Sequence, residues 1–174
     1  MAACVFDSTL MLLLTDDLAL APPPPPTIAD PNQGKAADLA RDRLGFLLET
    51  LDDERTDVVV PTPVLTELLI SAKTNVAATL TVLAGLARLR MEAFGQRAAI
   101  ECAEMLRRAG RGTGPKAKAK FDHQIVAIAK VIGAVAVYSD DSDVKALCAR
   151  EGIECKGVWD LPVRPVDAQQ KLDF

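Results

Sequence analysis

The chain has 174 residues, of which 49% are hydrophobic and 25% are charged. This is about the length of one domain, and a body of this size buries roughly 70% of the surface that its unfolded chain exposes, so it needs no metal or disulfide to support a core. The composition excludes a disordered chain, a collagen-like chain and a disulfide scaffold, and the net charge of −4 argues against binding double-stranded nucleic acid by bulk charge, although it does not exclude a local basic patch.

The first third of the chain predicts two buried strands separated by a helix. The short apolar run Ala3–Phe6 is typical of a buried parallel strand, and Leu10–Leu14 continue as one or two helical turns. From Lys35, apolar residues recur at three- and four-residue steps, which predicts an amphipathic helix. We expect this helix to end near Leu51, because a run of acidic residues follows. Val58–Val60 form the second predicted strand.

Residues 15–34 interrupt this pattern. They contain consecutive prolines at positions 22–26, which favour an extended polyproline helix. We interpret the segment as a surface insertion in a single domain that spans residues 1–174, and a partner-binding arm is the alternative.

The remaining two thirds alternate between helices and strands. Thr62 is the predicted N-cap of the helix after the second strand, and Pro63 is its first residue. The later predicted elements are a helix from about Asn75, a short strand near 91–94, a helix over 98–106, a glycine-rich loop at 110–115, a helix over 117–132, a strand over 134–138, a short helix to Arg150 and a last strand near Ile153. This alternation predicts an α/β fold, a parallel sheet covered by helices on both faces.

The cysteines, histidine and aromatic residues exclude several classes of site. The cysteines form no C-x-x-C pair, and the lone His123 cannot complete a zinc finger. Seven aromatic residues (five Phe, one Tyr, one Trp) are too few for a platform that stacks single-stranded nucleic acid. We therefore expect the cysteines to be reduced. The apolar runs and the N-terminal pattern predict no membrane span and no signal peptide, so we expect a cytoplasmic protein. The four cysteines are Cys4, Cys102, Cys148 and Cys155.

Carboxylates fall at the predicted ends of strands and beside apolar helix faces. Asp7 closes the first strand, and Asp140 or Asp141 follows the strand over 134–138. Ligands of open parallel sheets bind outside the carboxyl ends of the strands, so we expect these acids at the functional edge. Glu67 and Asp122 lie on or beside the apolar faces of their helices. His123 is expected to point away from the stripe that carries Asp122.

Carboxylates that gather in one place require cations, because like charges and burial both oppose ionisation. Such a site suits Mg²⁺ or Mn²⁺, which lower the pKa of a bound water and make a histidine base unnecessary. The alternatives are that Asp7 caps the following turn, that the acids of 140–143 form an ordinary N-cap cluster, and that Glu67 and Asp122 pair with lysine or arginine.

Four segments that carry these acids resemble, in their order, the four motifs of PIN domains. The resemblance covers residue 3 to about residue 155, apart from residues 15–34. It implies a three-layer α/β/α sandwich with a central parallel sheet of four to five strands, and a Mg²⁺- or Mn²⁺-dependent nuclease, most often a ribonuclease. Many members, including the VapC-like group, are toxins that an antitoxin silences and that form homodimers. The segments are Val5–Ser8, Val60–Leu69, Phe121–Ala129 and Ser139–Val144.

The resemblance also implies roles for individual residues. The implied catalytic metal ligands are Asp7, Glu67, Asp122 and Asp141, with Asp143 at the edge of the metal site and Ser139 and Asp140 in support. Ser139 stands where the family frequently has threonine. Thr9 stands where the family commonly has an asparagine, two residues after the first acid.

A basic cluster leads into Asp122 and contains no acidic residue. We expect it to bind the phosphates of an RNA substrate beside the acidic site, and a solvated loop is the alternative. The cluster consists of Arg107, Arg108, Arg111, Lys116, Lys118 and Lys120.

The leading hypothesis from the sequence is a metal-dependent ribonuclease, either the toxin of a toxin–antitoxin pair or a solitary enzyme. Three alternatives stay open: a nuclease for DNA or branched structures, a PIN-like scaffold that binds RNA or protein without cutting, and a phosphoacceptor signalling domain. Thr9, which departs from the family pattern, is the reason to retain the scaffold as an alternative. A phosphoacceptor domain has its acidic pair near the end of the first strand, whereas Asp140 and Asp141 follow a later strand.

Overall fold

The computed structural model describes residues 2–16, 18–25, 36–109 and 116–165, and its centre is a parallel sheet. The five strands of the described chain lie in the order β3-β2-β1-β4-β5, and every neighbouring pair is parallel. The strands are β1 (Ala3–Phe6), β2 (Asp57–Pro61), β3 (Leu89–Glu92), β4 (Ala136–Tyr138) and β5 (Cys155–Lys156).

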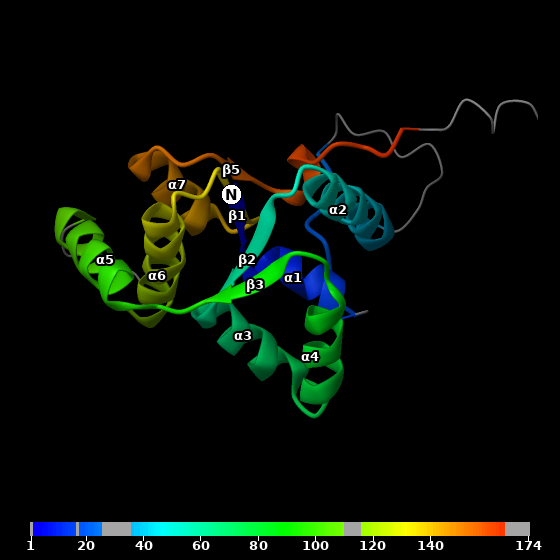
Figure 1. Ribbon diagram of the computed structural model, residues 1–174, viewed down its shortest axis with the longest axis horizontal. Helices are drawn as coiled ribbons and strands as arrows, with labels where there is room; N and C mark the ends of the chain where they lie inside the picture. Colours follow the sequence, from blue (N-terminus) through cyan, green and yellow to red (C-terminus); the bar gives the residue numbers. More distant parts are fainter. Residues whose placement is uncertain (1, 17, 26–35, 110–115, 166–174) are drawn as a thin grey trace, which may run out of the picture.

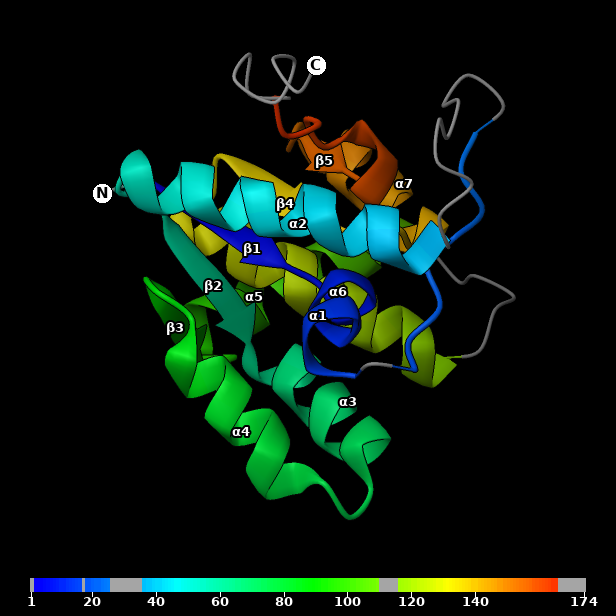
Figure 2. The ribbon, with the colours of Figure 1, turned by 90° about the vertical axis from the view of Figure 1, so that its right-hand side faces the viewer.

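Helices cover both faces of this sheet. The strand order runs one way from β1 to β3 and the other way from β4 to β5, so right-handed crossovers place α1–α4 on one face and α5–α7 on the opposite face. Figures 1 and 2 show α2 and α4 on one side of the sheet and α5 and α6 on the other. The predicted α/β/α sandwich is therefore confirmed. The helices are α1 (Ser8–Thr15), α2 (Ala36–Asp53), α3 (Thr62–Ala72), α4 (Val76–Gly85), α5 (Gln96–Ala109), α6 (Lys116–Ile132) and α7 (Ser142–Glu151), with a 3₁₀ helix η1 (Val158–Asp160).

The central strands form the middle of the core. Val5 and Phe6 of β1 and Val59 and Val60 of β2 are fully buried, because both faces of the sheet are covered. Phe6 packs against Tyr138 of β4, with ring centroids 4.9 Å apart. This packing fixes the ends of β1 and β4 relative to each other.

Several predicted boundaries differ from the structure. The helix predicted to end near Leu51 continues to Asp53, because Asp52 pairs with Arg88 at 3.0 Å and the chain turns only at Arg55, which has a positive φ of 56°. Pro61, not Thr62, is the N-cap of α3. The two edge strands, β3 and β5, lie within a few residues of their predicted positions.

The insertion predicted at residues 15–34 is described as far as residue 25, and residues 26–35 lie outside the described part. Its first half is not a free loop. Arg41 of α2 donates to the carbonyl oxygens of Leu13 and Asp16, both at 3.1 Å, and the indole N–H of Trp159 donates to the carbonyl of Pro22 at 3.0 Å.

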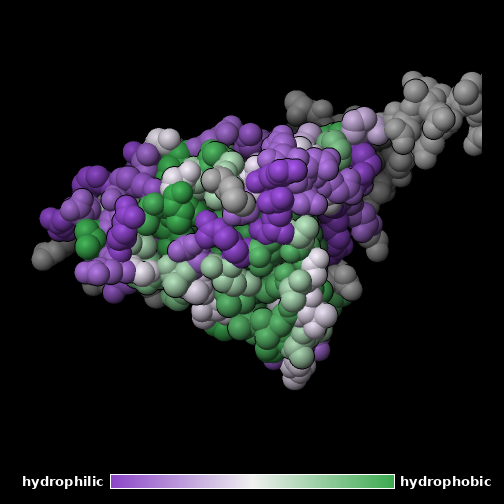
Figure 3. Space-filling model, in the orientation of Figure 1, coloured by the Kyte–Doolittle hydropathy of each residue, from purple (hydrophilic) through white to green (hydrophobic). Residues whose placement is uncertain are grey.

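Apolar side chains are exposed on α3 and α4. Ile70, Leu80 and Val82 are 72%, 43% and 40% exposed. Figure 3 shows a hydrophobic area over these two helices in the lower part of the view. Within the described residues, no helix is both long enough and apolar enough to cross a membrane.

Candidate active site

The candidate site lies where β1 and β4 end. The chain adds β2 and β3 on one side of β1 and adds β4 and β5 on the other side. The point between β1 and β4 is therefore a topological switch point, where open α/β sheets bind their ligands. The backbone N–H of Asp7 donates to the carbonyl of Tyr138 at 3.0 Å, which continues the β1–β4 ladder by one residue. Asp7 therefore lies level with Ser139, as the sequence predicted for the edge acids.

The Asp7 carboxylate points across to β4. Asp7 is only 3% exposed and is the N-cap residue of α1, but its side chain makes no capping hydrogen bond. The hydroxyl of Ser139 donates to Asp7 Oδ2 at 2.6 Å, and the same hydroxyl accepts from the N–H of Asp141 at 3.0 Å. Asp7 therefore occupies the N-cap position without capping α1 through its side chain, and Ser139 connects the two acids.

Thr9 makes a second connection between the same strand ends. Its hydroxyl lies 3.3 Å from Asp7 Oδ2 and accepts from the N–H of Asp140 at 3.0 Å. The residue that departs from the resemblance thus holds the first acid and the segment after β4 together. Only the tertiary structure reveals this contact, because the two partners of Thr9 belong to segments far apart in the chain.

Burial dominates the electrostatics of Asp7. Burial raises the pKa of Asp7, hydrogen bonds from Ser139 and from the backbone of Ser8 act in the opposite direction, and the charge of Asp141 raises the pKa further. No lysine or arginine is among the described groups that act on this carboxylate. A buried carboxylate beside a second carboxylate is suited to bind a divalent cation, because the cation offsets the two charges and prefers oxygen ligands.

Asp140 and Asp141 have different roles. Asp141 is the N-cap of α7, where Oδ1 accepts from the N–H of Asp143 at 2.7 Å, so the N-cap alternative is correct for this residue. Asp140 turns toward η1, where its Oδ1 accepts from the N–H of Val158 at 2.9 Å. Burial raises the pKa of Asp140, and its other oxygen is buried without a hydrogen-bond partner among the described residues. Asp140 thus joins the end of β4 to η1.

Glu67 and Asp122 lie on helices that begin at the same edge of the sheet. Asp122 is 7% exposed and lies in the first half of α6, which leads into β4 and packs against it. Glu67, near the middle of α3, is partly exposed.

The structure does not gather all the predicted acids. Neither Glu67 nor Asp122 is among the groups that act on Asp7. Within the described chain, no three or more histidine, cysteine, aspartate or glutamate side chains are close enough together to hold an ion. Coordination by the predicted set therefore stays a prediction, and the pair Asp7 and Asp141 is its described part.

His123 is buried, and the expectation that it points away from the stripe that carries Asp122 stays a prediction. Its exposed fraction is 7%, equal to that of Asp122. The reason is that α6 packs against β1, β4, α3, α5 and α7, so that more than one face of the helix is covered. A single apolar stripe in the sequence did not indicate so wide a buried face.

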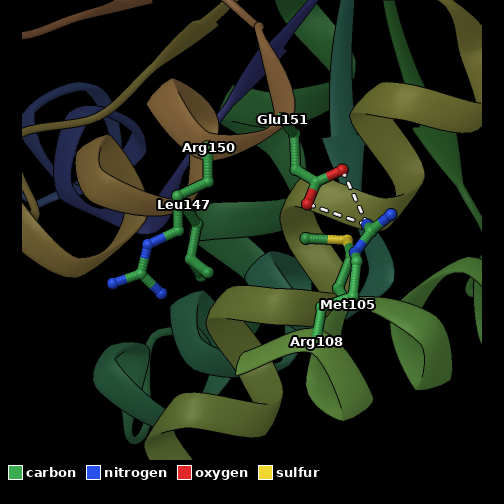
Figure 4. A pocket seen from close by; sticks show the side chains of 5 residues that line it. All are labelled: Met105, Arg108, Leu147, Arg150 and Glu151. Carbon is green, nitrogen blue, oxygen red and sulfur yellow. Dashed lines mark hydrogen bonds and ion pairs between the residues drawn. The ribbon is translucent and has the colours of Figure 1, made fainter. Parts of the chain in front are cut away.

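Two arginines of the predicted basic cluster form ion pairs with glutamates. Arg108 contacts Glu151 at 2.9 Å, and Glu151 is about 15 Å along α7 from Asp141. Figure 4 shows this pair beside a pocket of about 460 Å³, which Arg150 also lines with its guanidinium directed away from the pair. Arg107 pairs with Glu104 at 3.3 Å. Lys120 is exposed, whereas the Arg111, Lys116 and Lys118 side chains lie outside the described part.

A cleft of about 560 Å³ opens beside the acids. One of its walls is formed by the first half of the insertion, which sequence reasoning did not place near the site. The only sequence signal was the proximity of this segment to Asp7 along the chain. The cleft is lined by Thr9, Leu12, Asp16, Ala19, Leu20, Pro22, Ser71, Asp140, Asp141 and Ser142.

Comparisons with known proteins agree with this geometry. The family model described as PIN domain matches residues 36–149, more than half of the chain. A chain in the crystal structure of VapBC2 from Rickettsia felis, bound to a fragment of promoter DNA, is similar with a TM-score of 0.59 and 14% identity, over 89% of this chain and 98% of that one. No curated protein matches the sequence.

Two further solved structures share the fold. A chain of DNA-bound VapBC from Salmonella typhimurium has a TM-score of 0.54 and 17% identity, over 91% of this chain and 99% of that chain. VapC20 of Mycobacterium tuberculosis, described as a toxin that cleaves the sarcin-ricin loop, has a TM-score of 0.50 and 16% identity, over 82% of this chain and 93% of its own. At these identities the likeness establishes the fold.

Proposed function

Because the chain belongs to the PIN domain family, we propose that it is a toxin-type ribonuclease that hydrolyses RNA phosphodiester bonds in the cytoplasm with Mg²⁺ or Mn²⁺. The observation that carries the proposal is the buried Asp7 carboxylate beside Asp141 at the switch point, with no described lysine or arginine acting on it. The RNA-cleaving toxin among the similar structures supports RNA as the substrate. The proposal treats residues 1–174 as one domain with an insertion at 15–34.

The residues around Asp7 are suited to hold a cation. Asp7 and Asp141 would bind it, joined by the predicted ligands Glu67, Asp122 and Asp143. A bound Mg²⁺ or Mn²⁺ polarises a phosphoryl oxygen and lowers the pKa of a water molecule. The Ser139 hydroxyl keeps Asp7 Oδ2 in place and favours the ionised carboxylate. Thr9 and Asp140 hold the end of β4 against α1 and η1.

Cleavage assays with labelled RNA and DNA test the proposal directly. We expect the protein to cut RNA with Mn²⁺ or Mg²⁺ and not to cut it with EDTA. The cleavage rate of Asp122→Asn is expected to be lower by at least about tenfold, the size of loss typical for residues near a metal. Asp53→Asn is the matched control, because Asp53 is exposed at the end of α2 that leads into β2, at the opposite edge of the sheet.

The outcomes separate the alternatives. Cleavage that survives EDTA contradicts metal dependence. Cleavage of DNA alone favours a DNA or structure-specific nuclease, and binding without cleavage in every metal favours the scaffold.

We expect Lys120 and Arg108 to have different effects. Lys120 is exposed and makes no ion pair with a described residue. If it binds a phosphate, Lys120→Ala weakens RNA binding and reduces the slope of log affinity against log salt by about one. The same measurement on the triple variant Arg111→Ala, Lys116→Ala, Lys118→Ala tests the rest of the cluster, and an unchanged affinity and slope in both variants would remove the cluster from the proposal.

Arg108 is expected to support stability instead. Burial alone raises the pKa of Glu151, but Lys130 and Arg108 outweigh it, and the pKa lies below its usual range. Lys130 contacts Glu151 at 2.7 Å and keeps that charge partly paired in Arg108→Ala. We therefore expect urea unfolding to report a loss of about 0.5–1 kcal/mol, with unchanged RNA affinity. Weaker RNA binding in this variant would return Arg108 to the substrate site.

An antitoxin and a second copy of the chain are the proposed protein partners. The similar VapBC structures support an antitoxin. The exposed apolar face of α3 and α4 supports a homodimer, because contiguous exposed apolar surface is typical of protein interfaces. Sedimentation velocity on the parent chain and on Ile70→Glu tests the dimer, which the variant is expected to dissociate.

A further inference from the structure

The segment Leu18–Pro22 is held firmly although it forms no helix or strand. The guanidinium of Arg41 donates to the carbonyl oxygens of Leu13, Asp16 and Ala19, at 3.1, 3.1 and 3.5 Å. At the other end, the indole of Trp159 donates to the carbonyl of Pro22 at 3.0 Å. Both anchors belong to the body of the domain, to α2 and η1. Figure 2 shows the segment rising from the end of α1 past the start of α2.

Trp159 is itself fixed in place. The guanidinium of Arg43 lies over its ring at 5.6 Å from the ring centroid, and the same group donates to the carbonyl of Trp159 at 3.1 Å. Two arginines of α2 therefore position the segment, one directly and one through Trp159.

This anchored segment exposes large apolar side chains beside the acids. Leu18 is 87% exposed and Leu20 is 92% exposed. Leu20, Ala19 and Pro22 line the same cleft as Asp140 and Asp141. The backbone of this segment is anchored while the two leucine side chains are exposed to solvent. These side chains do not contribute to the core, and the arrangement is typical of a contact surface.

The side chains that line the cleft suit the base of a nucleotide better than its phosphate. The polar lining of the cleft includes Asp16, Asp140 and Asp141, whose negative charges repel any phosphate other than the one that a bound cation would hold. Its apolar lining suits a nucleobase, and unstacked bases of single-stranded RNA are commonly bound against side chains in this way. The volume of about 560 Å³ lies within the range of ordinary small-molecule sites.

We propose that Leu18–Pro22 forms a nucleobase subsite that holds the base next to the scissile phosphate, with Arg41 as the positioning residue. The inference rests on the proposed ribonuclease function, since a phosphodiester at Asp7 and Asp141 places a neighbouring nucleoside in this cleft. Leu20 contacts the base, and Arg41 acts through the backbone that carries Leu20.

Substitution of Leu20 tests the subsite without disturbing the core. Leu20→Ser is expected to raise KM for an RNA oligonucleotide about fivefold while kcat changes less than about twofold, because an apolar contact is lost and the acids are untouched. Binding of the same labelled RNA in EDTA is expected to weaken by the same factor. On an oligonucleotide that lacks the base next to the cleaved bond, Leu20→Ser is expected to have no effect.

Two further variants complete the test. Val135→Ser is the matched control, because Val135 is 57% exposed and precedes β4, at the opposite edge of the sheet. It is expected to change neither KM nor binding. Arg41→Lys keeps the charge but loses the planar group that reaches three carbonyl oxygens, and it is expected to raise KM as Leu20→Ser does.

The results distinguish failure of the subsite from failure of the function. If the parent cuts RNA and Leu20→Ser has the parent's KM and binding, the subsite is overturned and Leu20 is left as a protein contact. An equal loss on the oligonucleotide without the base also overturns it. If the parent cuts no RNA, the proposed function fails, and the binding measurements in EDTA still decide whether Leu20 contacts a base.

Discussion

Replacing Asp7 with asparagine is expected to abolish metal-dependent cleavage and to stabilise the metal-free protein. Burial raises the pKa of Asp7 in the folded chain, so the stability that this group contributes is fully present below the ordinary carboxyl pKa and is lost as pH rises through the raised value. Above the raised pKa, the buried carboxylate of Asp7 carries a charge beside Asp141 and lowers the free energy of unfolding. Asparagine has no charge and removes this cost.

Thermal unfolding of the parent and of Asp7→Asn, each with EDTA and with Mn²⁺, measures both effects. In EDTA at neutral pH the variant is expected to have the higher Tm, by about 2–4 °C for each kcal/mol gained, and this difference is expected to shrink as the pH is lowered. Mn²⁺ is expected to raise the Tm of the parent alone, because only a folded state that binds the ion is stabilised by it. Cleavage is expected to fall at least about a hundredfold.

The control for Asp7→Asn is Asp53→Asn, which removes an exposed charge far from the site. It is expected to keep the parent's cleavage and its response to Mn²⁺. An equal Mn²⁺ shift in the parent and in Asp7→Asn would exclude Asp7 as a metal ligand.

Ser139→Ala is expected to give the second large effect, on both stability and activity. The Ser139 hydroxyl is fully buried, donates to Asp7 Oδ2 at 2.6 Å and accepts from the N–H of Asp141 at 3.0 Å. Alanine leaves the part-buried N–H of Asp141 and the buried Asp7 Oδ2 without this partner, which costs about 1–3 kcal/mol in urea unfolding. Because the lost hydrogen bond favours the ionised carboxylate, the pKa of Asp7 rises further, and metal binding shifts to higher pH.

Ser139→Thr is the matched variant, because it keeps the hydroxyl and is the residue that the family frequently has at this place. We expect it to retain parental cleavage and parental pH dependence of the Mn²⁺ shift in Tm, whereas Ser139→Ala loses about 10–100-fold in cleavage. If alanine and threonine behave alike in all three measurements, the hydroxyl does not position the acids.

The arrangement of strands and helices could be predicted from local patterns. Continuous apolar runs such as Val58–Val60 indicated strands buried on both faces, and three- and four-residue periodicity indicated the helices between them. The acid that closes β1 and the acids after β4 were placed at one edge by a general property of parallel sheets. Boundaries were less well predicted, as at Asp53, because the charge of Asp52 is compensated by Arg88, a residue far along the chain.

What the sequence by itself determined is therefore the order of the elements and the acidic character of one sheet edge, since both follow from neighbours along the chain. Only the tertiary structure decided that Ser139 and Thr9 connect the acids, that Arg108 pairs with Glu151, and that Arg41 anchors the segment that carries Leu20 beside the acids. Each of these contacts joins segments that are distant in sequence. Local propensity carries no information about such pairs, because their geometry is set by how the helices pack on the sheet.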